Sequence, residues 1–101
     1  MQQLLCLEKD EIDINDIWNF KITITGAQEN REAHLIGLLS NSAMGISSVE
    51  TTIYNDNELN VVLFQKLAGS KYSGKLDKRI IIGKNISKVT FGSAREIIWH
   101  N

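Results

Sequence analysis

Proline is absent from this sequence of 101 residues, and cysteine occurs once, as Cys6. Because linkers between domains are often rich in proline, its absence favours one domain spanning residues 1–101. A single cysteine cannot form an internal disulfide, and together with two histidines it is too little for a zinc site of typical Cys/His spacing. The sequence therefore predicts no metal site and no cofactor.

Long hydrophobic runs are missing as well. The apolar run from Leu4 to Leu7 ends at Glu8, and every apolar run is far shorter than the roughly 20 residues that cross a membrane. The start of the sequence also lacks the basic and apolar regions of a secretory signal. We therefore expect a cytoplasmic protein without membrane contact, in which Cys6 is buried and unreactive within a first strand over residues 4–7.

Several segments have the pattern of β-strands. Residues 20–25 alternate Phe20, Ile22 and Ile24 with polar side chains, which is typical of a half-buried strand. Four further runs are rich in β-branched or apolar residues and predict strands at 49–54, 79–82, 86–91 and 95–99. The last two flank Gly92-Ser93-Ala94, which suits the turn of a C-terminal hairpin.

Two other segments have helical spacing. Residues 29–39 place Ala33, Ile36 and Leu39 on one helical face, although a strand with alternating Ala33, Leu35, Gly37 and Leu39 is the alternative. Residues 56–67 have a better pattern, with Asp56 as N-cap and Gly69 after the end. The apolar residues on that helical face are Leu59, Val62, Leu63 and Leu67. These elements predict an α+β fold, with about two helices packed on a mixed or largely antiparallel sheet of five to six strands.

Charge is divided between the two parts of the chain. Residues 1–65 contain ten acidic and three basic residues, whereas residues 66–101 contain eight basic and two acidic ones. Separated charge of this kind can steer a partner to one face. The acidic stretch lacks the glycine and glutamate positions of an EF-hand, so it does not indicate a calcium site. It instead favours a surface for a basic protein, made by Glu8, Asp10, Glu11, Asp13 and Asp16.

Trp18 follows the acidic stretch and is a candidate aromatic anchor for such a partner, because buried aromatic residues often dominate binding energy. Its position just before an alternating strand is also typical of a core residue. The basic third of the chain offers a second interpretation, since lysine and arginine can bind phosphates while aromatics stack on bases. The candidate residues for nucleic acid are Lys71, Lys75, Lys78, Arg79, Lys84 and Lys88.

Signs of catalysis are weak. The stretch from Gly69 to Lys75 has the glycine and lysine spacing of a phosphate-binding loop, but Leu76 replaces the required Ser/Thr. An enzyme would need a site assembled from distant residues, with His34 or His100 beside a carboxylate.

We therefore expect a non-catalytic protein-binding module, specifically a small inhibitor or immunity protein that neutralises a nuclease-type toxin through an acidic surface. A nucleic-acid-binding domain and a small enzyme are the alternatives. A homodimer in which acidic and basic surfaces meet is a further hypothesis.

Overall fold

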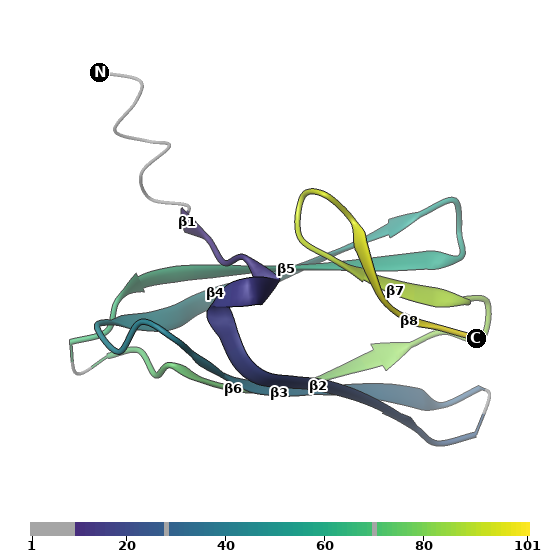
Figure 1. Cartoon of the computed structure of the whole chain (residues 1–101). Helices are drawn as coiled ribbons and strands as arrows, with labels where there is room; N and C mark the ends of the chain where they lie inside the picture. Colours follow the sequence, from purple (N-terminus) through teal and green to yellow (C-terminus); the bar gives the residue numbers. More distant parts are fainter. Residues whose placement is uncertain (1–9, 28, 70) are drawn as a thin grey trace.

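The computed structural model of the chain describes residues 10–27, 29–69 and 71–101, which form two β-sheets packed face to face (Figure 1). Sheet A contains β1 (Asp10–Glu11), β4 (Met44–Tyr54), β5 (Glu58–Leu67), β7 (Lys88–Phe91) and β8 (Glu96–His100). Sheet B contains β2 (Ile17–Thr25), β3 (Arg31–Leu39) and β6 (Lys75–Ile82). A single 3-10 turn, η1 (Ile14–Asp16), connects β1 to β2.

Strand β5 is the centre of sheet A. It pairs with β4 along one side, and with β1 and β7 along the other. The β5–β7 pair is parallel, whereas the remaining pairs of both sheets are antiparallel. Strand β3 is the centre of sheet B, between β2 and β6. The chain passes between the two sheets four times, so the layers are tied together at both ends.

The core lies between the sheets, because alternate side chains of each strand point into this space. Leu59, Val61 and Leu63 of β5 face Ala33 and Leu35 of β3, and all five are at most 5% exposed. The other buried hydrophobic residues of this single core are Ile12, Ile17, Leu39, Leu76, Ile82, Ile86, Val89 and Phe91. The described chain is thus one all-β domain.

The predicted α+β class is wrong, since the described ranges contain no α-helix. Residues 31–39 form the central strand of sheet B, so the alternative strand was correct: Ala33, Leu35 and Leu39 are buried on one face. Ile36 and Leu38 lie on the opposite face, where they are 37% and 46% exposed. Ile36, which lies outside the core, produced the helical spacing together with the buried Ala33 and Leu39.

The predicted helix over 56–67 is also wrong. Asn55 and Asp56 both have positive φ, at 54° and 63°, and the Asn57 amide donates to the Tyr54 carbonyl at 3.2 Å. Positive φ at two successive turn residues is the geometry of a tight hairpin, and Asn and Asp tolerate it better than other non-glycine residues. Asp56 is therefore a turn residue between β4 and β5 and does not cap a helix.

Most predicted strands are confirmed. Residues 20–25 lie in β2, 49–54 in β4 and 79–82 in β6, while β7 and β8 form the C-terminal hairpin. The described residues form eight strands, more than the five to six expected, because the two supposed helices are strands and Asp10–Glu11 forms a further short one. The predicted strand at 4–7, together with Cys6 and Glu8, lies outside the described residues.

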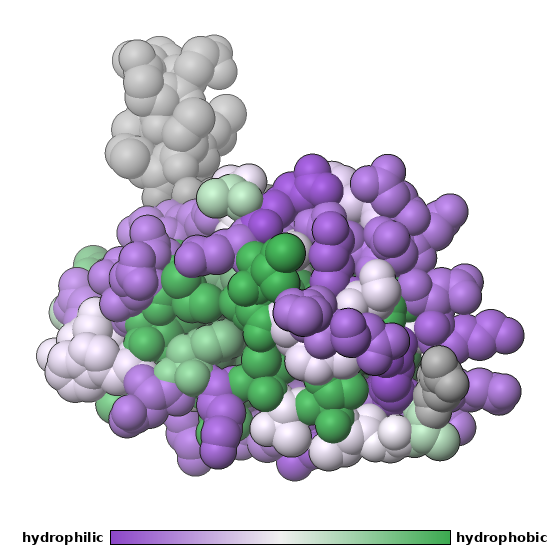
Figure 2. All heavy atoms as spheres, turned by 45° about the vertical axis from the view of Figure 1, so that its right-hand side comes forward, coloured by the Kyte–Doolittle hydropathy of each residue, from purple (hydrophilic) through white to green (hydrophobic). Residues whose placement is uncertain are grey.

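Large hydrophobic side chains also reach the surface. Trp18, Ile53, Leu67, Ile81 and Ile97 are each more than half exposed. Figure 2 shows hydrophobic side chains gathered on one side of the molecule, between hydrophilic side chains above and below them. No helix in the described part of the chain has the length and hydrophobicity needed to span a membrane.

Candidate functional site

The outer face of sheet B, which points away from sheet A, carries an exposed row of apolar side chains. Trp18 of β2 lies opposite Leu38 of β3, and Ile36 follows two residues away on the same face of β3. Trp18 is 56% exposed, so its interpretation as a core residue is wrong. We refer to Trp18, Ile36 and Leu38 as the Trp18 face.

The backbone around Trp18 has an unusual local geometry. The β2–β3 register shifts between Trp18 and Lys21, and Asn19 inside this bulge has a φ of 57°. Opposite the bulge, a Cβ at Gly37 would lie 2.4 Å from Ile17 Cγ2 and 3.3 Å from the Trp18 carbonyl oxygen. Bulges redirect side chains at strand edges, and non-glycine residues at positive φ concentrate at functional sites. The bulge and Gly37 together hold Ile17 in the core while Trp18 points outward.

Two hollows share Trp18 and Leu38 in their walls. The first, of about 540 Å³, extends over Ile36 and Gly37 to Lys75 and Asp77 of β6. The second, of about 450 Å³, extends toward the loops that follow β3 and β5, and is lined by Ser40, Asn41, Ser42, Met44, Ala68, Tyr72 and Gly74 among others. Apolar hollows beside an exposed tryptophan are a common arrangement in interfaces that bind a protein or a small molecule.

Apart from Ile81, the rest of this sheet face is largely polar. His34 Nε2 lies 2.6 Å from Asp77 Oδ1, and the Arg79 guanidinium lies 3.3 Å from Glu32. The hydrogen bond from His34 lowers the pKa of Asp77, with help from the charges of Lys75 and Arg79. Sheet B therefore does bring His34 beside a carboxylate, as the enzyme hypothesis requires. The pair lies on an open strand face, and His34 is not among the residues that line either hollow.

The acidic stretch lies where the chain passes from sheet A to sheet B. Asp10 accepts from Gln65 at 3.3 Å, and Asp13 caps η1 by accepting from the Asn15 amide at 2.9 Å. Glu11 accepts from the amide and hydroxyl of Ser93, which ties β1 to the turn of the C-terminal hairpin. Asp16 is exposed, and its carbonyl accepts from the Ser40 amide at 2.8 Å. The acidic side chains of the segment Asp10–Asp16 are thus exposed, while Ile12 between them is buried in the core, and the end of the segment adjoins the Trp18 face.

The basic residues of the C-terminal third do not share one surface. Arg79 is paired with Glu32 and Lys88 lies 3.9 Å from Glu58. Lys75 and Arg79 lie on the outer face of β6, and Lys78 on its other face. Lys71 and Lys84 lie in two different loops, after β5 and after β6. This distribution does not favour the continuous basic groove expected of a nucleic-acid-binding domain.

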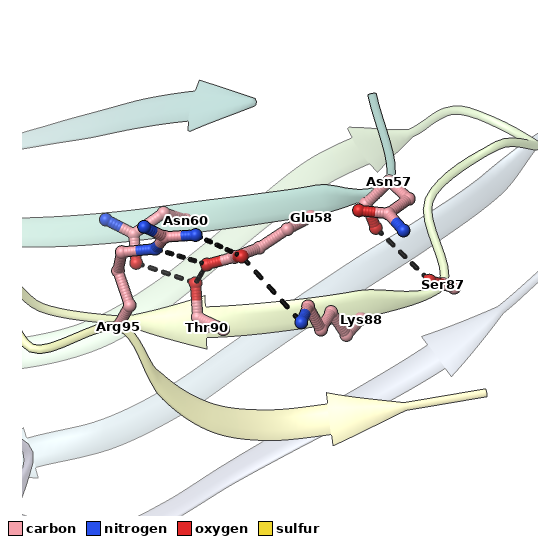
Figure 3. A network of polar contacts seen from close by, with 7 residues as sticks. All are labelled: Asn57, Glu58, Asn60, Ser87, Lys88, Thr90 and Arg95. Atoms are coloured by element: carbon pink, nitrogen blue, oxygen red, sulfur yellow. Dashed lines mark hydrogen bonds and ion pairs between the residues drawn. The ribbon is translucent and has the colours of Figure 1, made fainter. Parts of the chain in front are cut away.

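A buried ionic network lies on the outer face of sheet A (Figure 3). Glu58, only 2% exposed, accepts two hydrogen bonds from Arg95 at 2.7 and 2.9 Å and one from the Thr90 hydroxyl at 2.7 Å. These bonds, led by that from Arg95, lower the pKa of Glu58 to about 2. The Thr90 hydroxyl also lies 2.8 Å from the Asn60 side chain. Since the Thr90 hydroxyl has one proton, it can donate to only one of these two oxygens, Glu58 Oε2 or Asn60 Oδ1, at a time.

Arg95 joins this network from the turn between β7 and β8. Its φ is 55°, and its guanidinium lies 4.0 Å from the centre of the Tyr54 ring. A planar guanidinium can pair with a carboxylate in two places and still stack on an aromatic ring. The network therefore fixes the C-terminal hairpin over β4 and β5. Sequence reasoning missed it, because Glu58 and Arg95 lie 37 positions apart.

Arg31 is a second buried cation, at the start of β3. It is 7% exposed and donates to the carbonyls of Gly83 and Ile86 at 3.2 and 2.6 Å. Its guanidinium lies 5.5 Å from the centre of the Trp99 ring. These contacts hold the β6–β7 loop against the end of the core, which is a structural role. Trp99 is partly buried against the core, and Phe91 is fully buried.

Within the described residues, no three His, Cys, Asp or Glu side chains are grouped so that they could hold a metal ion. Comparison with known proteins gives no match to a family model, to a curated protein or to a solved structure. The functional assignment therefore depends on the geometry of the two sheets and their side chains.

Proposed function

We propose that this protein is a non-catalytic binding module that docks a partner protein on the Trp18 face. The partner class that we infer is a basic protein, and a nuclease-type toxin neutralised by a small inhibitor or immunity protein is the specific hypothesis. Nucleic acid is the weaker alternative, because the basic side chains are divided among two loops and several strand faces.

The observation that carries the proposal is the exposure of Trp18 together with Ile36 and Leu38. Single exposed apolar residues are common on soluble proteins and need no explanation. Here three large side chains adjoin across two strands, and hollows of about 540 and 450 Å³ meet at Trp18 and Leu38. Tryptophan is enriched among the residues that dominate binding energy, particularly where its surroundings can exclude water.

The bulge in β2 supports the same proposal. Asn19 at positive φ is a conformation that most side chains avoid, and a side chain at Gly37 would collide with Ile17. A regular strand would not need either feature. The bulge keeps Ile17 in the core and at the same time turns Trp18 outward, and non-glycine residues at positive φ are concentrated at functional sites.

Charge supports a basic partner. Asp10, Glu11, Asp13 and Asp16 are exposed along β1 and η1, and η1 runs directly into β2 and Trp18. Carboxylates beside an apolar docking face accelerate association with a positively charged partner, and they weaken the binding of acidic partners. The same carboxylates also have structural contacts, so a test must choose substitutions that keep these contacts.

The test is affinity capture from the source cells, with the protein encoded next to this chain as the first candidate partner. Wild-type protein, Trp18→Ser and Ile81→Ser are compared by quantitative mass spectrometry. Ile81 is a matched control, because it is 73% exposed and lies on the same sheet face, opposite Glu32 at the other end of β3. The proposal predicts a protein that is retained by the wild type and by Ile81→Ser and lost with Trp18→Ser. A partner retained equally by all three would overturn it.

The contribution of charge is tested with the purified complex. Asp10, Asp13 and Asp16 are replaced together by Asn, which can still accept the hydrogen bond from Gln65 and can still cap η1. Glu11 is left in place because it holds the Ser93 turn. The association rate at low salt should fall by roughly tenfold or more, and the difference should shrink as salt rises. An unchanged rate would remove these carboxylates from recognition.

A further inference from the structure

The second half of β4 has an open edge. Residues 48–54 pair with β5 along one side, and no described strand pairs with their other side. The first half is closed, because the Ile46 amide donates to the Ser73 carbonyl at 2.9 Å. Thr51, Thr52 and Ile53 are exposed, and Ile53 is 59% exposed beside a hollow of about 460 Å³. An open strand edge presents unpaired amide and carbonyl groups to any chain that can align with it.

The edge strands β2, β6 and β8 carry features that oppose such pairing. Strand β2 has a bulge between Trp18 and Lys21, and β8 has only five residues and begins with Glu96. Strand β6 has Lys75 and Arg79 on one face and Lys78 on the face that points toward sheet A. Bulges, short edges and lysines, especially inward-pointing ones, are the usual protection against edge-to-edge association.

The open part of β4 lacks these features. Its sequence, Ser-Val-Glu-Thr-Thr-Ile-Tyr, contains no lysine and no proline, and Glu50 is its single charged residue. Its register to β5 is regular, since the one shift in this pair lies earlier, between Ile46 and Ser48. A seven-residue edge without protection is long enough for a full strand pairing.

We propose that two copies of this chain pair through β4 as antiparallel neighbours, with Thr51 opposite Thr51 of the second copy. In this register Val49 of each copy lies opposite Ile53 of the other copy, on the inner face of sheet A. The dimer therefore contains two such apolar pairs. Glu50 lies opposite Thr52, and Ser48 opposite Tyr54. A register centred on Glu50 would instead bring two carboxylates together, which is unfavourable for directly opposed cross-strand residues. The edge is therefore self-complementary in one register.

Such a pairing has two-fold symmetry and is closed, so it gives a dimer and no filament. The two five-stranded sheets become one continuous sheet, and the axis is perpendicular to it. Both copies of sheet B then lie on the same side of the continuous sheet, and their Trp18 faces point in the same general direction. The inference does not depend on the proposed function, because β4 and the Trp18 face belong to different sheets.

The first test is the mass of the full chain in solution across a dilution series. Wild-type protein and Thr25→Lys should have twice the mass of one chain at the highest concentration, and Thr51→Lys should have the mass of one chain throughout. Thr25 is a suitable control because it is exposed on an edge strand and lies opposite Glu32. A monomeric wild type at every concentration, or a dimeric Thr51→Lys variant, would overturn the proposal. Circular dichroism checks that each variant is folded.

The second test reads the register and does not depend on the lysine variant. In a Cys6→Ser background, Thr51→Cys places two cysteines opposite each other, within the Cα separation that a disulfide allows. Ile53→Cys is the matched control, because it lies opposite Val49. Mild oxidation should give a disulfide-linked dimer several times faster for Thr51→Cys than for Ile53→Cys. Equal rates, or no cross-link at position 51, would contradict the proposed pairing.

Discussion

Glu58 shows how one buried carboxylate can organise several elements. It comes from β5, yet its partners come from β7 and from the following turn, and Arg95 also stacks on Tyr54 of β4. A carboxylate this buried would be unfavourable without charged and hydroxyl donors. The network therefore couples the last hairpin to the centre of sheet A.

This coupling predicts a dependence of stability on pH. The pKa of Glu58 is lowered from 4.5 to about 2 in the folded state, so its stabilising effect is fully present above about pH 5 and is lost as the pH falls toward 2. Glu58→Gln should lower the melting temperature at neutral pH and flatten its decline in this acidic range. Part of the decline will remain, because the pKa of Asp77 is lowered as well. The measurement is thermal unfolding from pH 2 to 7.

Glu29→Gln is the control for that experiment, since Glu29 is exposed in the connection between β2 and β3. Its melting curve should follow the wild type throughout. If Glu58→Gln retained the full acidic decline of the wild type, the titration of Glu58 would not be its cause.

Gly37 lies closely against Ile17, the core residue that precedes Trp18. Gly37→Ala should destabilise the fold by about 1–3 kcal/mol, because the new Cβ would lie 2.4 Å from a side-chain carbon of Ile17. Gly83→Ala is the control: its Cβ would meet nothing within 4 Å, and its effect should stay within about 0.5 kcal/mol. Denaturant unfolding measures both. Equal stabilities for Gly37→Ala and Gly83→Ala would show that the bulge can move to make room for the new Cβ at little cost.

Strand β5 explains why periodicity failed for residues 58–67. Leu59, Val61 and Leu63 face the core, but Glu58 and Asn60 on the other face are buried as well, under the Arg95 network. A strand buried on both faces loses the alternation that identifies strands. The β-branched pair Val61-Val62 and the polar turn Asn55-Asp56-Asn57 were the local signals in favour of a hairpin.

The hairpin makes a prediction about Asp56. Asp56→Gly should raise stability by a few tenths to about 1 kcal/mol, because Asn-Gly is the preferred pair when both turn residues have positive φ. If residues 56–67 were a helix with Asp56 as N-cap, the same change would lower stability by a few tenths of a kcal/mol. Asp56→Val should cost about 1–2 kcal/mol, since a β-branched side chain is strained in this conformation. Thermal unfolding of the wild type and the two variants shows whether each substitution raises or lowers stability.

Strand β3 was misread for a different reason. Its core face follows the expected alternation, but Ile36 and Leu38 place apolar side chains on the outer face as well. The local pattern thus conflicts with the fold at the residues of the Trp18 face. Conflicts of this kind are expected at functional surfaces, where a side chain is selected for a partner and not for the core.

The charge division of the sequence has a partial counterpart in the folded domain. The four carboxylates of the segment Asp10–Asp16 are exposed, as the sequence indicated. The basic residues are instead dispersed, and three of them pair with Glu32 or Glu58. Sequence order was informative for the acidic stretch because its members are adjacent in the chain. It could not reveal the ion pairs between elements of the same sheet, because these pairs depend on strand order.

Trp18 could be named as a candidate anchor from the sequence, but Ile36, Leu38 and Gly37 could not. Their proximity to Trp18 follows from the register between β2 and β3, and from a bulge that no local pattern announces. The prediction of a protein-binding module remains a proposal, now attached to a defined surface.

The most direct test of the proposed docking face is the dissociation constant of the purified complex for the wild type, Trp18→Ser and Ile81→Ser. Trp18→Ser should weaken binding by about 30-fold or more, corresponding to ~2 kcal/mol for a dominant interface residue, while Ile81→Ser binds as the wild type. Unfolding curves should show that both variants are folded. Equal dissociation constants for all three proteins would contradict the assignment of the Trp18 face as the docking surface.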